Sequence, residues 1–462
     1  KGGNWKWNHT GNNLIKLSGT LNNPLFYRMY VYGTNTAYTS QGAIGCSSGT
    51  VTSNWKVDNC TFYQVPFGTY INSDSAGTHE NPIVSNCKFL ESPRFASDSS
   101  SGSGLGLVFS EGGTGRIING TSLNNYFYKC GRHGLYISDG GNVTSINDKF
   151  YKHRDDGGAI VTELSAFQVA RNSKNVNIIS PYFEGCKDTA LTVTPVQTSG
   201  VQTFCKNISV ISPIFKNNYA TCLRIGSDSP SVNGTIFGLK VLDIKIYSDG
   251  EASGIGVNFS SGTDITVDGV YVTENSGASS LNQLVRLYGY GTTSETNNII
   301  IKNVAGVMQG GSSSGIYCGT LTCTGTAEYR VENSSAGITP INYQTTVTNV
   351  DLLENSPPGI IVDYPRSNSD PNTVYSAVPG TIFVSKTGTG RSLWIKETLT
   401  GSSGWTPVKT NYVSKGTTAN RTSLGNNAID KGNMYLDTDL AVSGQPIWWN
   451  GTIWVDSAGA SA

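Results

Sequence analysis

Acidic side chains end three similar segments, and this pattern is the first sign of chemistry in the chain. The segments are Gly-Leu-Val-Phe-Ser-Glu at 106–111, Gly-Leu-Tyr-Ile-Ser-Asp at 134–139 and Gly-Ala-Ile-Val-Thr-Glu at 158–163. Their final acids follow one another at offsets of 28 (139 − 111) and 24 (163 − 139) residues. If the segments stack, Glu111, Asp139 and Glu163 occupy one position on three successive coils, and we call them the acid column.

Carboxyl groups stacked in this way could act as an acid and base pair on a sugar linkage. Like charges close together raise one another's pKa. Glycoside hydrolysis uses one protonated and one ionised carboxyl, roughly 5 Å apart in retaining enzymes and roughly 6.5–9.5 Å apart in inverting ones. Neighbours in the column would have the first separation, and Glu111 and Glu163, at about 9.6 Å, the second. We therefore expect the acid column to be catalytic; the alternative is three solvated acids, each paired with a base.

Basic and imidazole side chains gather on the same segments. Two of the four histidines each lie beside an arginine, and two aspartates follow the second pair. The residues are Arg132, His133, His153, Arg154, Asp155 and Asp156. We expect them to bind substrate, for example an acidic sugar, although one histidine could be the base of a lyase acting beside a uronate carboxylate. For Arg132 and Asp155, 23 residues apart (155 − 132), pairing across neighbouring coils is an equally good interpretation.

Tyrosines offer aromatic rings on which a sugar can stack. Tyr128 and Tyr151 share one outward position of the repeat, and Tyr136 lies in the middle segment of the acid column. We expect Tyr136 and Tyr151 to contact substrate. Ordinary packing of aromatic rings along a strand is the alternative interpretation of Tyr128 and Tyr151.

A repeating fold is needed to bring these residues together, and the chain does repeat. Residues 122–129 and 145–152 are near copies at an offset of 23 (145 − 122), in which apolar and polar residues alternate around one large residue. Alternation predicts strands, and self-similarity at this period predicts a solenoid. The large inward residue recurs as Phe62, Phe89, Phe127, Phe150, Phe183, Phe215, Ile246, Val272 and Val307.

The variable spacing of this repeat favours a right-handed, single-stranded parallel β-helix. Intervals run from 23 (150 − 127) to 38 (127 − 89) residues, as expected when strands are fixed and the loops between them vary. Successive coils would stack about 4.8 Å apart. A β-sandwich is the alternative, but the repeats lack the tight hairpin turns that it needs at each junction. We predict an all-β chain with small antiparallel β modules at its C-terminus.

Composition agrees with this fold and argues against several partners. The 462 residues include 55 glycines and only three methionines, which is typical of a turn-rich β protein. Because 32 basic residues balance 32 acidic ones without a basic block, we expect neither nucleic acid nor a membrane surface as a partner. No apolar run approaches the roughly 18 residues of a membrane span. The chain begins at Lys1 rather than Met, so we expect it to be part of a longer protein.

The nine cysteines form no Cys-x-x-Cys pair, and the sequence indicates neither a metal site nor a cofactor. Cys60 and Cys87 each lie two residues before a large inward residue, Phe62 or Phe89. We therefore expect buried thiols in adjacent coils, because free cysteine is among the most buried residue types. Disulfides or metal ligation are the alternatives.

Four regions follow from the repeat and its breaks. We expect an N-terminal cap and first coils at 1–50, the parallel β-helix at 51–325, a terminal coil and linker at 326–375, and a β-rich oligomerisation or capping region at 376–462. The last region is too small to bury its many aromatic residues alone. We therefore expect its tryptophans to pack against another copy of the chain: Trp394, Trp405, Trp448, Trp449 and Trp454.

The C-terminal motif and the long repeat together resemble bacteriophage tailspike depolymerases, particularly the capsule-degrading ones. The motif is Gly-Asn-Met-Tyr-Leu-Asp-Thr at 432–438, followed by Pro-Ile-Trp-Trp-Asn-Gly-Thr-Ile-Trp-Val-Asp at 446–456. The resemblance implies a homotrimer in the virion, attached to the phage tail or baseplate through a missing N-terminal segment. It also implies binding and cleavage of a bacterial capsular or O-antigen polysaccharide. Catalytic residues differ in place among such proteins, so the resemblance assigns none here.

We accordingly expect a tailspike-type endoglycosidase that uses the acid column. Two alternatives remain open at this point. A polysaccharide lyase would release products with a new double bond that absorbs ultraviolet light, whereas a non-catalytic receptor-binding spike would bind the glycan and leave its chain length unchanged.

Overall fold

Strands make up almost all of the regular structure in this chain. The computed structural model describes residues 3–7, 13–33, 42–73, 77–94, 103–112, 114–154, 164–195, 203–226, 234–249, 254–260, 262–275, 281, 283–287, 296–308, 314–318, 322–334, 339–343, 348–355, 360–363, 382–385, 392–396, 405–408, 413–421, 434–440, 445–450 and 452–455. Within them the only helix is α1 (Thr418–Arg421). No helix in this part of the chain is long and apolar enough to cross a membrane.

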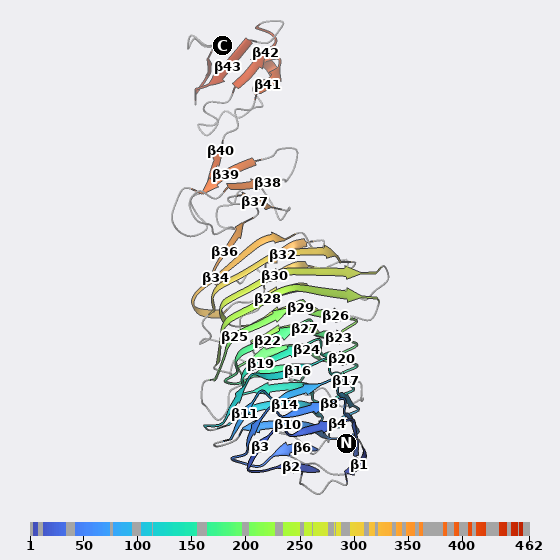
Figure 1. The fold of residues 1–462 in the computed structure, drawn as a ribbon. Coiled ribbons are helices and arrows are strands. Elements are labelled where there is room, and N and C mark those ends of the chain that lie inside the picture. The colour runs from blue at the N-terminus through green and yellow to red at the C-terminus, as the bar shows by residue number, and fades with distance from the viewer. Residues whose placement is uncertain are drawn as a thin grey trace. The chain divides into compact units, whose positions relative to one another are not determined.

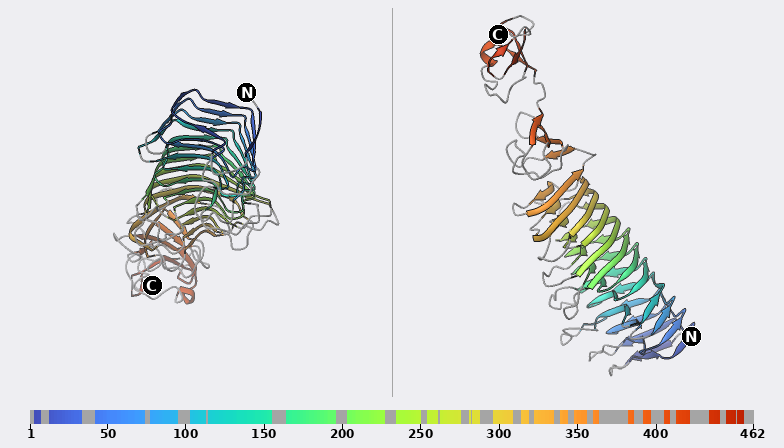
Figure 2. Two further views of the ribbon diagram at one scale, coloured as in Figure 1. Left: turned by 90° about the horizontal axis from the view of Figure 1, so that it is seen from below. Right: turned by 90° about the vertical axis from the view of Figure 1, so that its left-hand side faces the viewer.

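The chain divides into two compact units, Lys1–Pro357 and Pro358–Ala462. The first unit is a stack of coils whose strands pair in parallel with those of the coil before and after (Figures 1 and 2). This confirms the predicted parallel β-helix. Pairing begins with β1, in which Trp5 pairs with Val31, and continues to β36, in which Asn355 pairs with Glu332.

Three parallel sheets run along the first unit. The sheet that opens each coil consists of β2 (Ile15–Leu17), β6 (Ile44–Cys46), β10 (Phe67–Ser73), β14 (Leu105–Glu111), β18 (His133–Ser138), β21 (Ser165–Ala170), β24 (Thr189–Thr194), β27 (Thr221–Ile225), β29 (Ile255–Phe259), β31 (Gln283–Leu287), β33 (Ser314–Cys318) and β35 (Thr339–Tyr343). A short second sheet contains β3 (Thr20–Asn22), β7 (Val51–Ser53), β11 (Thr78–Glu80) and β15 (Arg116–Ile118).

The third and largest sheet closes each coil. In the lower coils it receives two short strands per coil: β4 (Leu25–Tyr27), β5 (Met29–Gly33), β8 (Lys56–Asp58), β9 (Thr61–Tyr63), β12 (Ile83–Ser85), β13 (Lys88–Leu90), β16 (Gly120–Leu123), β17 (Tyr126–Tyr128), β19 (Gly141–Ile146), β20 (Lys149–Tyr151), β22 (Lys174–Ile179), β23 (Tyr182–Glu184), β25 (Thr203–Ile211) and β26 (Ile214–Lys216). Its other members are β1 (Gly3–Trp7) and the longer β28 (Gly234–Ser248), β30 (Gly262–Glu274), β32 (Thr296–Val307), β34 (Thr322–Ser334) and β36 (Thr348–Asn355).

The coils turn at corners whose residues have positive φ. At one corner an asparagine stands in coil after coil with φ between 49° and 55°: Asn23, Asn54, Asn81, Asn119, Asn142, Asn175 and Asn207. Asparagine tolerates this left-handed conformation better than most residues. The side-chain amides also bond between coils, for example from Asn54 Nδ2 to Asn23 Oδ1 at 3.0 Å and from Asn207 Nδ2 to Asn175 Oδ1 at 3.1 Å.

Stacked phenylalanine rings fill the interior, and we call them the phenylalanine column. Consecutive rings lie 4.7–5.0 Å apart between centroids and nearly parallel, at 5–12°. Strand register confirms the predicted stacking from Phe62 to Val272. The members are Phe62, Phe89, Phe127, Phe150, Phe183 and Phe215, continued by Ile246 and Val272.

The prediction fails at the next coil, where Val272 pairs with Gly306 and Val307 pairs with Thr273. Gly306 has a φ of +126°. A Cβ atom there would lie 2.0 Å from the carbonyl oxygen of Val272, so only glycine fits this close approach. The sequence pattern favours Val307 because it is the nearest bulky residue, although the backbone register is set one residue earlier.

The cysteines behave as expected. Cys60 and Cys87 are free, buried thiols in adjacent coils, and the Cys60 amide donates to Cys87 Sγ at 3.5 Å. Burial, with the neighbouring Cys60 thiol, raises the pKa of Cys87 well above its usual value. Cys87 is therefore a packing group rather than a reactive thiol.

The second unit contains two four-stranded sheets of one design. The first comprises β37 (Ile360–Asp363), β38 (Ile382–Ser385), β39 (Ser392–Lys396) and β40 (Trp405–Val408), and the second β41 (Val413–Gly416), β42 (Met434–Asp437), β43 (Gln445–Trp449) and β44 (Trp454–Val455). In each sheet one parallel pair precedes two antiparallel pairs. The predicted antiparallel modules are therefore present, with a parallel edge that was not expected.

The second of these sheets buries aromatic residues within itself. Trp449 and Trp454 lie 5.6 Å apart between ring centroids and pack with Tyr435 and Ile447 in one buried cluster. The Tyr435 hydroxyl donates to the carbonyl oxygen of Thr417 at 2.8 Å. The expectation that these two tryptophans need another copy of the chain is therefore wrong, because strand pairing already closes a small core around them.

Candidate functional site

Strand register tests the acid column directly. Ser73 pairs with Glu111, and Ser110 pairs with Ser138, so Glu111 and Asp139 do stand at equivalent positions of adjacent coils. In the next coil Ser138 pairs with Ala170, which places Arg171 rather than Glu163 after it.

The strand above β18 is therefore β21 and not residues 158–163. Phe167 and Val169 pair with Leu135 and Ile137 and fill the corresponding inward places. Both candidate segments alternate small and apolar residues, which is why the sequence alone favoured the wrong one. Glu163 lies outside the described residues, as do Asp155 and Asp156.

Glu111 is an interior residue rather than a solvated one. Glu111 is only 8% exposed, and its Oε1 accepts a hydrogen bond from the Ile117 amide at 2.7 Å. Burial raises the pKa of Glu111, opposed in part by that hydrogen bond and by the charges of Arg116 and Lys174. The Glu111 carboxyl group, at the end of β14, thus stabilises the connection to β15 by its hydrogen bond to the Ile117 amide.

Asp139 is half-exposed and has partners of its own. Its Oδ2 lies 3.7 Å from Arg171 Nη1 and accepts from Ser138 Oγ at 3.0 Å, and its Oδ1 accepts from Asn172 Nδ2 at 3.1 Å. This matches the alternative in which each acid is paired with a base. The column of three solvent-open acids is not formed, because its middle member is neutralised and its first is buried.

The two histidines expected to bind substrate lie inside the corner where the largest sheet ends. His133 is 3% exposed, stacks on Tyr136 at 5.1 Å between ring centroids, and contacts the Ser165 carbonyl oxygen through Nδ1 at 2.7 Å. His153 is 2% exposed, and neither ring nitrogen has a hydrogen-bond partner among the described residues. Burial lowers the pKa of His153 to about 3 and that of His133 well below its usual value.

Two further residues predicted to bind substrate, Arg154 and Tyr136, are engaged by other side chains of the protein. Arg154 is buried, and its Nη1 lies 3.1 Å from Asp188 Oδ2. Tyr136 packs against a small apolar cluster that contains Phe67, Leu105 and Val108. Arg132 is half-buried, and its proposed pairing with Asp155 falls outside the described residues. Burial therefore contradicts the expected substrate contacts of His133, His153 and Arg154. These side chains lie on the inner side of the corner and not on its surface.

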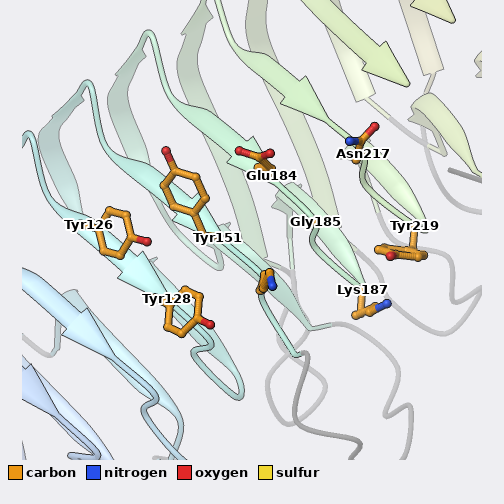
Figure 3. Close-up of a pocket in the computed structure, with 9 residues that line it drawn as sticks. Tyr126, Tyr128, Tyr151, Glu184, Gly185, Lys187, Asn217 and Tyr219 are labelled. Atoms are coloured by element: carbon orange, nitrogen blue, oxygen red, sulfur yellow. The ribbon is translucent and has the colours of Figure 1, made fainter. Parts of the chain in front are cut away.

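A groove of about 410 Å³ opens on the outer surface of β17, β20 and β23 and at the corners that follow β20, β23 and β26 (Figure 3). We call it the tyrosine groove. Among the predicted site residues it contains Tyr151; the sequence also singled out Tyr128. It is lined by Tyr126, Tyr128, Tyr151, Lys152, Glu184, Gly185, Lys187, Asn217 and Tyr219.

The groove residues flank the phenylalanine column in the sequence. Tyr126 and Tyr128 enclose Phe127, and because side chains alternate along a strand they point outward where Phe127 points inward. The same holds for Tyr151 beside Phe150 and for Glu184 beside Phe183. This signal was available in the sequence, but Lys187 and Tyr219 follow corners and could not be placed from alternation.

Aromatic rings form a continuous strip along the groove and its edge. The Tyr126 and Tyr151 rings stack 4.8 Å apart, and Tyr151 and Tyr182 lie 5.5 Å apart at a tilt of 44°. Burial raises the pKa of Tyr126 and Tyr151, and burial together with Glu184 raises that of Tyr182. The phenols therefore remain neutral hydrogen-bonding groups at physiological pH.

The charged residues of the groove are arranged asymmetrically. Glu184 accepts from the Tyr182 hydroxyl at 2.8 Å and lies 3.6 Å from Lys216 Nζ. Lys187 Nζ lies 3.4 Å from the centroid of the Tyr219 ring, a cation–π contact. Within the described residues no cluster of three or more His, Cys, Asp or Glu side chains is arranged to hold a metal ion.

Comparison with known proteins gives distant structural likenesses only. No family model matches the chain, and no curated protein matches it. A double mutant of the periplasmic alginate epimerase AlgG shares 9% identity at a TM-score of 0.40, covering 73% of each chain. A tailspike protein of E. coli bacteriophage HK620, solved with a pentasaccharide, shares 11% at 0.39, covering 76% of this chain and 72% of that one.

PfbA, a surface adhesin of Streptococcus pneumoniae, shares 15% identity at a TM-score of 0.37, covering 82% of this chain and 92% of that one. Likenesses as distant as these assign neither a substrate nor a reaction. What identifies the chain is its own strand register: it is a parallel β-helix protein with a tyrosine-lined groove on its largest sheet.

Proposed function

We propose that this chain binds a polysaccharide, and that the tyrosine groove is the binding site. The observation that carries the proposal is the gathering of four tyrosines, two lysines, a glutamate and an asparagine in one open groove of about 410 Å³. Ligand sites of 300–1,000 Å³ that combine aromatic surface with a few polar groups are typical of proteins. Sugars present both C–H faces and hydroxyl groups, which suit tyrosine rings and their neutral hydroxyls.

The rigidity of the groove supports this proposal. Its strands are held by parallel pairing on both sides and by the phenylalanine column beneath. Side chains already fixed in the free protein lose little freedom on binding, which favours affinity. The resemblance to tailspikes agrees with a bacterial surface polysaccharide as ligand, and on that basis we propose a homotrimeric spike of a phage tail.

Tyr151→Ala is expected to weaken polysaccharide binding by about 5- to 30-fold, or about 1–2 kcal/mol, because Tyr151 joins Tyr126 to Tyr182. A panel of purified capsular and O-antigen polysaccharides should first be screened, and the Kd of the best ligand measured by calorimetry. Tyr271→Ala is the matched control, since Tyr271 is an exposed tyrosine of the same sheet outside the groove. If both variants bind the polysaccharide as tightly as the unaltered protein does, the groove is not the binding site.

Endoglycosidic hydrolysis is the second candidate function, and Glu111 and Asp139 favour it in one respect. They stand on adjacent coils, one a buried carboxyl with a raised pKa and the other a half-exposed carboxylate beside Arg171. Such hydrolysis uses two carboxyl groups that flank the scissile bond, one as the acid and one as the base or nucleophile. This pair lies at the corner after β14 and β18, so cleavage would take place away from the tyrosine groove.

Under this second proposal Asp139→Asn should lower the rate of chain cleavage at least about 100-fold while polysaccharide binding at the groove persists. Products are analysed by mass spectrometry for new reducing ends, and by ultraviolet absorbance for the double bond that a lyase would introduce. Glu163→Gln, which alters the third acid that the sequence predicted, serves as a comparison. A polysaccharide that is bound but keeps its length would instead identify a receptor-binding spike without catalysis.

A further inference from the structure

We propose that the tyrosine groove selects anionic polysaccharides, and that Lys152 and Lys187 read the acidic group. This inference rests on the proposed polysaccharide-binding function and specifies the class of ligand. It moves recognition of an acidic sugar away from His133, His153 and Arg154, which are buried, to two lysines that the sequence did not single out.

The first argument is the charge left in the groove after internal pairing. The groove contains two lysines and one glutamate. Glu184 is already engaged by Lys216 and by the Tyr182 hydroxyl, and neither of these two partners lines the groove. The nearby Asp188 pairs with Arg154. Across the described residues, Lys152 and Lys187 are members of no ion pair, so the groove presents positive charge to a ligand.

The second argument is the position of the two lysines. The Lys152 amide donates to the Glu184 carbonyl oxygen at 2.8 Å, so Gly185 stands directly above Lys152 in the next coil. A Cβ atom at Gly185 would lie 3.6 Å from Lys152 Cγ, and glycine leaves that space open. The absence of a side chain at Gly185 keeps the Lys152 stem uncovered at the corner, where Lys187 follows two residues later.

The third argument is that one of the charges is held in place. The Tyr219 ring supports Lys187 Nζ at 3.4 Å from its centroid. Figure 3 shows Lys187 and Tyr219 together at one end of the groove and Tyr126, Tyr128 and Tyr151 toward the other. An ammonium group fixed in this way loses little freedom when it meets an anion. A polysaccharide could thus lie with its rings along the tyrosines and its acidic group at the lysines.

The proposal predicts a dependence on charge that neutral sugars would not show. Attraction between solvent-exposed charges is screened by salt, with a Debye length of about 10 Å at 0.1 M and about 3 Å at 1 M. Binding of an acidic polysaccharide should therefore weaken as NaCl is raised. Conversion of its carboxylates to alcohols should weaken binding similarly, because the lysines would be desolvated without a partner.

The experiment compares acidic and neutral bacterial capsular polysaccharides, together with the carboxyl-reduced form of the best acidic ligand. Lys152→Gln and Lys187→Gln should each raise its Kd about tenfold and should not change the Kd of the carboxyl-reduced form. Lys240→Gln, which removes the same charge from an exposed residue of the same sheet outside the groove, should leave both values unchanged. Thermal unfolding of each variant verifies that the fold is intact.

Two outcomes would overturn the inference, and they can be told apart. If neutral polysaccharides bind as tightly as acidic ones, with affinity reduced by Tyr151→Ala but not by the lysine variants, the groove binds glycans without selecting charge. If acidic ligands bind but all three lysine variants lose affinity equally, the attraction is diffuse and the two groove lysines have no special role. In either case the proposed binding function is judged separately, by the effect of Tyr151→Ala alone.

Discussion

Phe150→Ala is expected to lower the free energy of unfolding by about 3–5 kcal/mol, the usual cost of removing a buried phenylalanine ring. Phe150 is fully buried between Phe127 at 4.7 Å and Phe183 at 4.8 Å, and a third ring, Phe167, lies 5.7 Å away. The parallel strands on either side are hydrogen-bonded to β20 and cannot collapse far into the cavity. Equilibrium denaturation in urea, followed by tyrosine fluorescence and circular dichroism, measures the loss.

Lys149→Ala is the control for this prediction, because Lys149 is exposed and precedes Phe150 on the same strand. Its effect should be within about 0.5 kcal/mol. Since long solenoids often unfold in more than one step, the comparison concerns the transition in which the coils melt. Equal midpoints for the two variants would mean that the stacked rings do not form the core described above.

Acidification from pH 7 to pH 4 is expected to destabilise the fold through His153 by about 3 kcal/mol. Burial lowers the pKa of His153 to about 3 in the folded chain, against the ordinary value of 6.5. As pH falls below about 6.5 the unfolded chain binds a proton at this residue and the folded chain does not. Stability from this group is therefore complete above about pH 6.5 and is lost progressively toward pH 3. His133 acts in the same direction.

His153→Asn isolates this contribution. Asn218 occupies the corresponding position two coils further on, three residues after Phe215 as His153 is three residues after Phe150, so an amide suits this corner. Asp148 opposes the histidines, because burial raises its pKa to about 6 and its contribution favours the fold as pH falls to about 4. The informative quantity is thus the difference in unfolding free energy between variant and unaltered protein at each pH. A difference that does not change between pH 7 and pH 4 would show that His153 is not buried as a neutral imidazole.

The body of the fold could be predicted from the sequence because its core repeats. Phe127 and Phe150 occupy near copies of one segment, and each lies between outward residues, so alternation alone reveals which side faces inward. The same logic places Cys60 and Cys87. The prediction of the column holds as far as Val272 and fails at Val307. A close backbone contact at Gly306 determines the register there, and such a contact leaves no pattern of apolar residues in the sequence.

The site was harder to predict, for two physical reasons. Residues 158–163 and 165–170 have similar patterns, and only the pairing of Phe167 with Leu135 shows which one forms the strand. Residues after a corner, such as Lys187 and Tyr219, do not follow the alternation that orients strand residues. The charged neighbours of His153 favour a surface position in the sequence, whereas the structure buries its side chain at the corner three residues after Phe150.

The strands that carry Phe127, Phe150 and Phe183 inward also carry the groove residues outward. The pitch of the core, 4.7–4.8 Å between these rings, is therefore the pitch of the binding surface as well. A polymeric ligand whose repeat length matches that spacing, or a multiple of it, can contact equivalent residues on several coils. A ligand with a different repeat length can make these contacts on only one coil. The packing of the interior thus determines which repeat lengths of a bound polymer the outer surface can match.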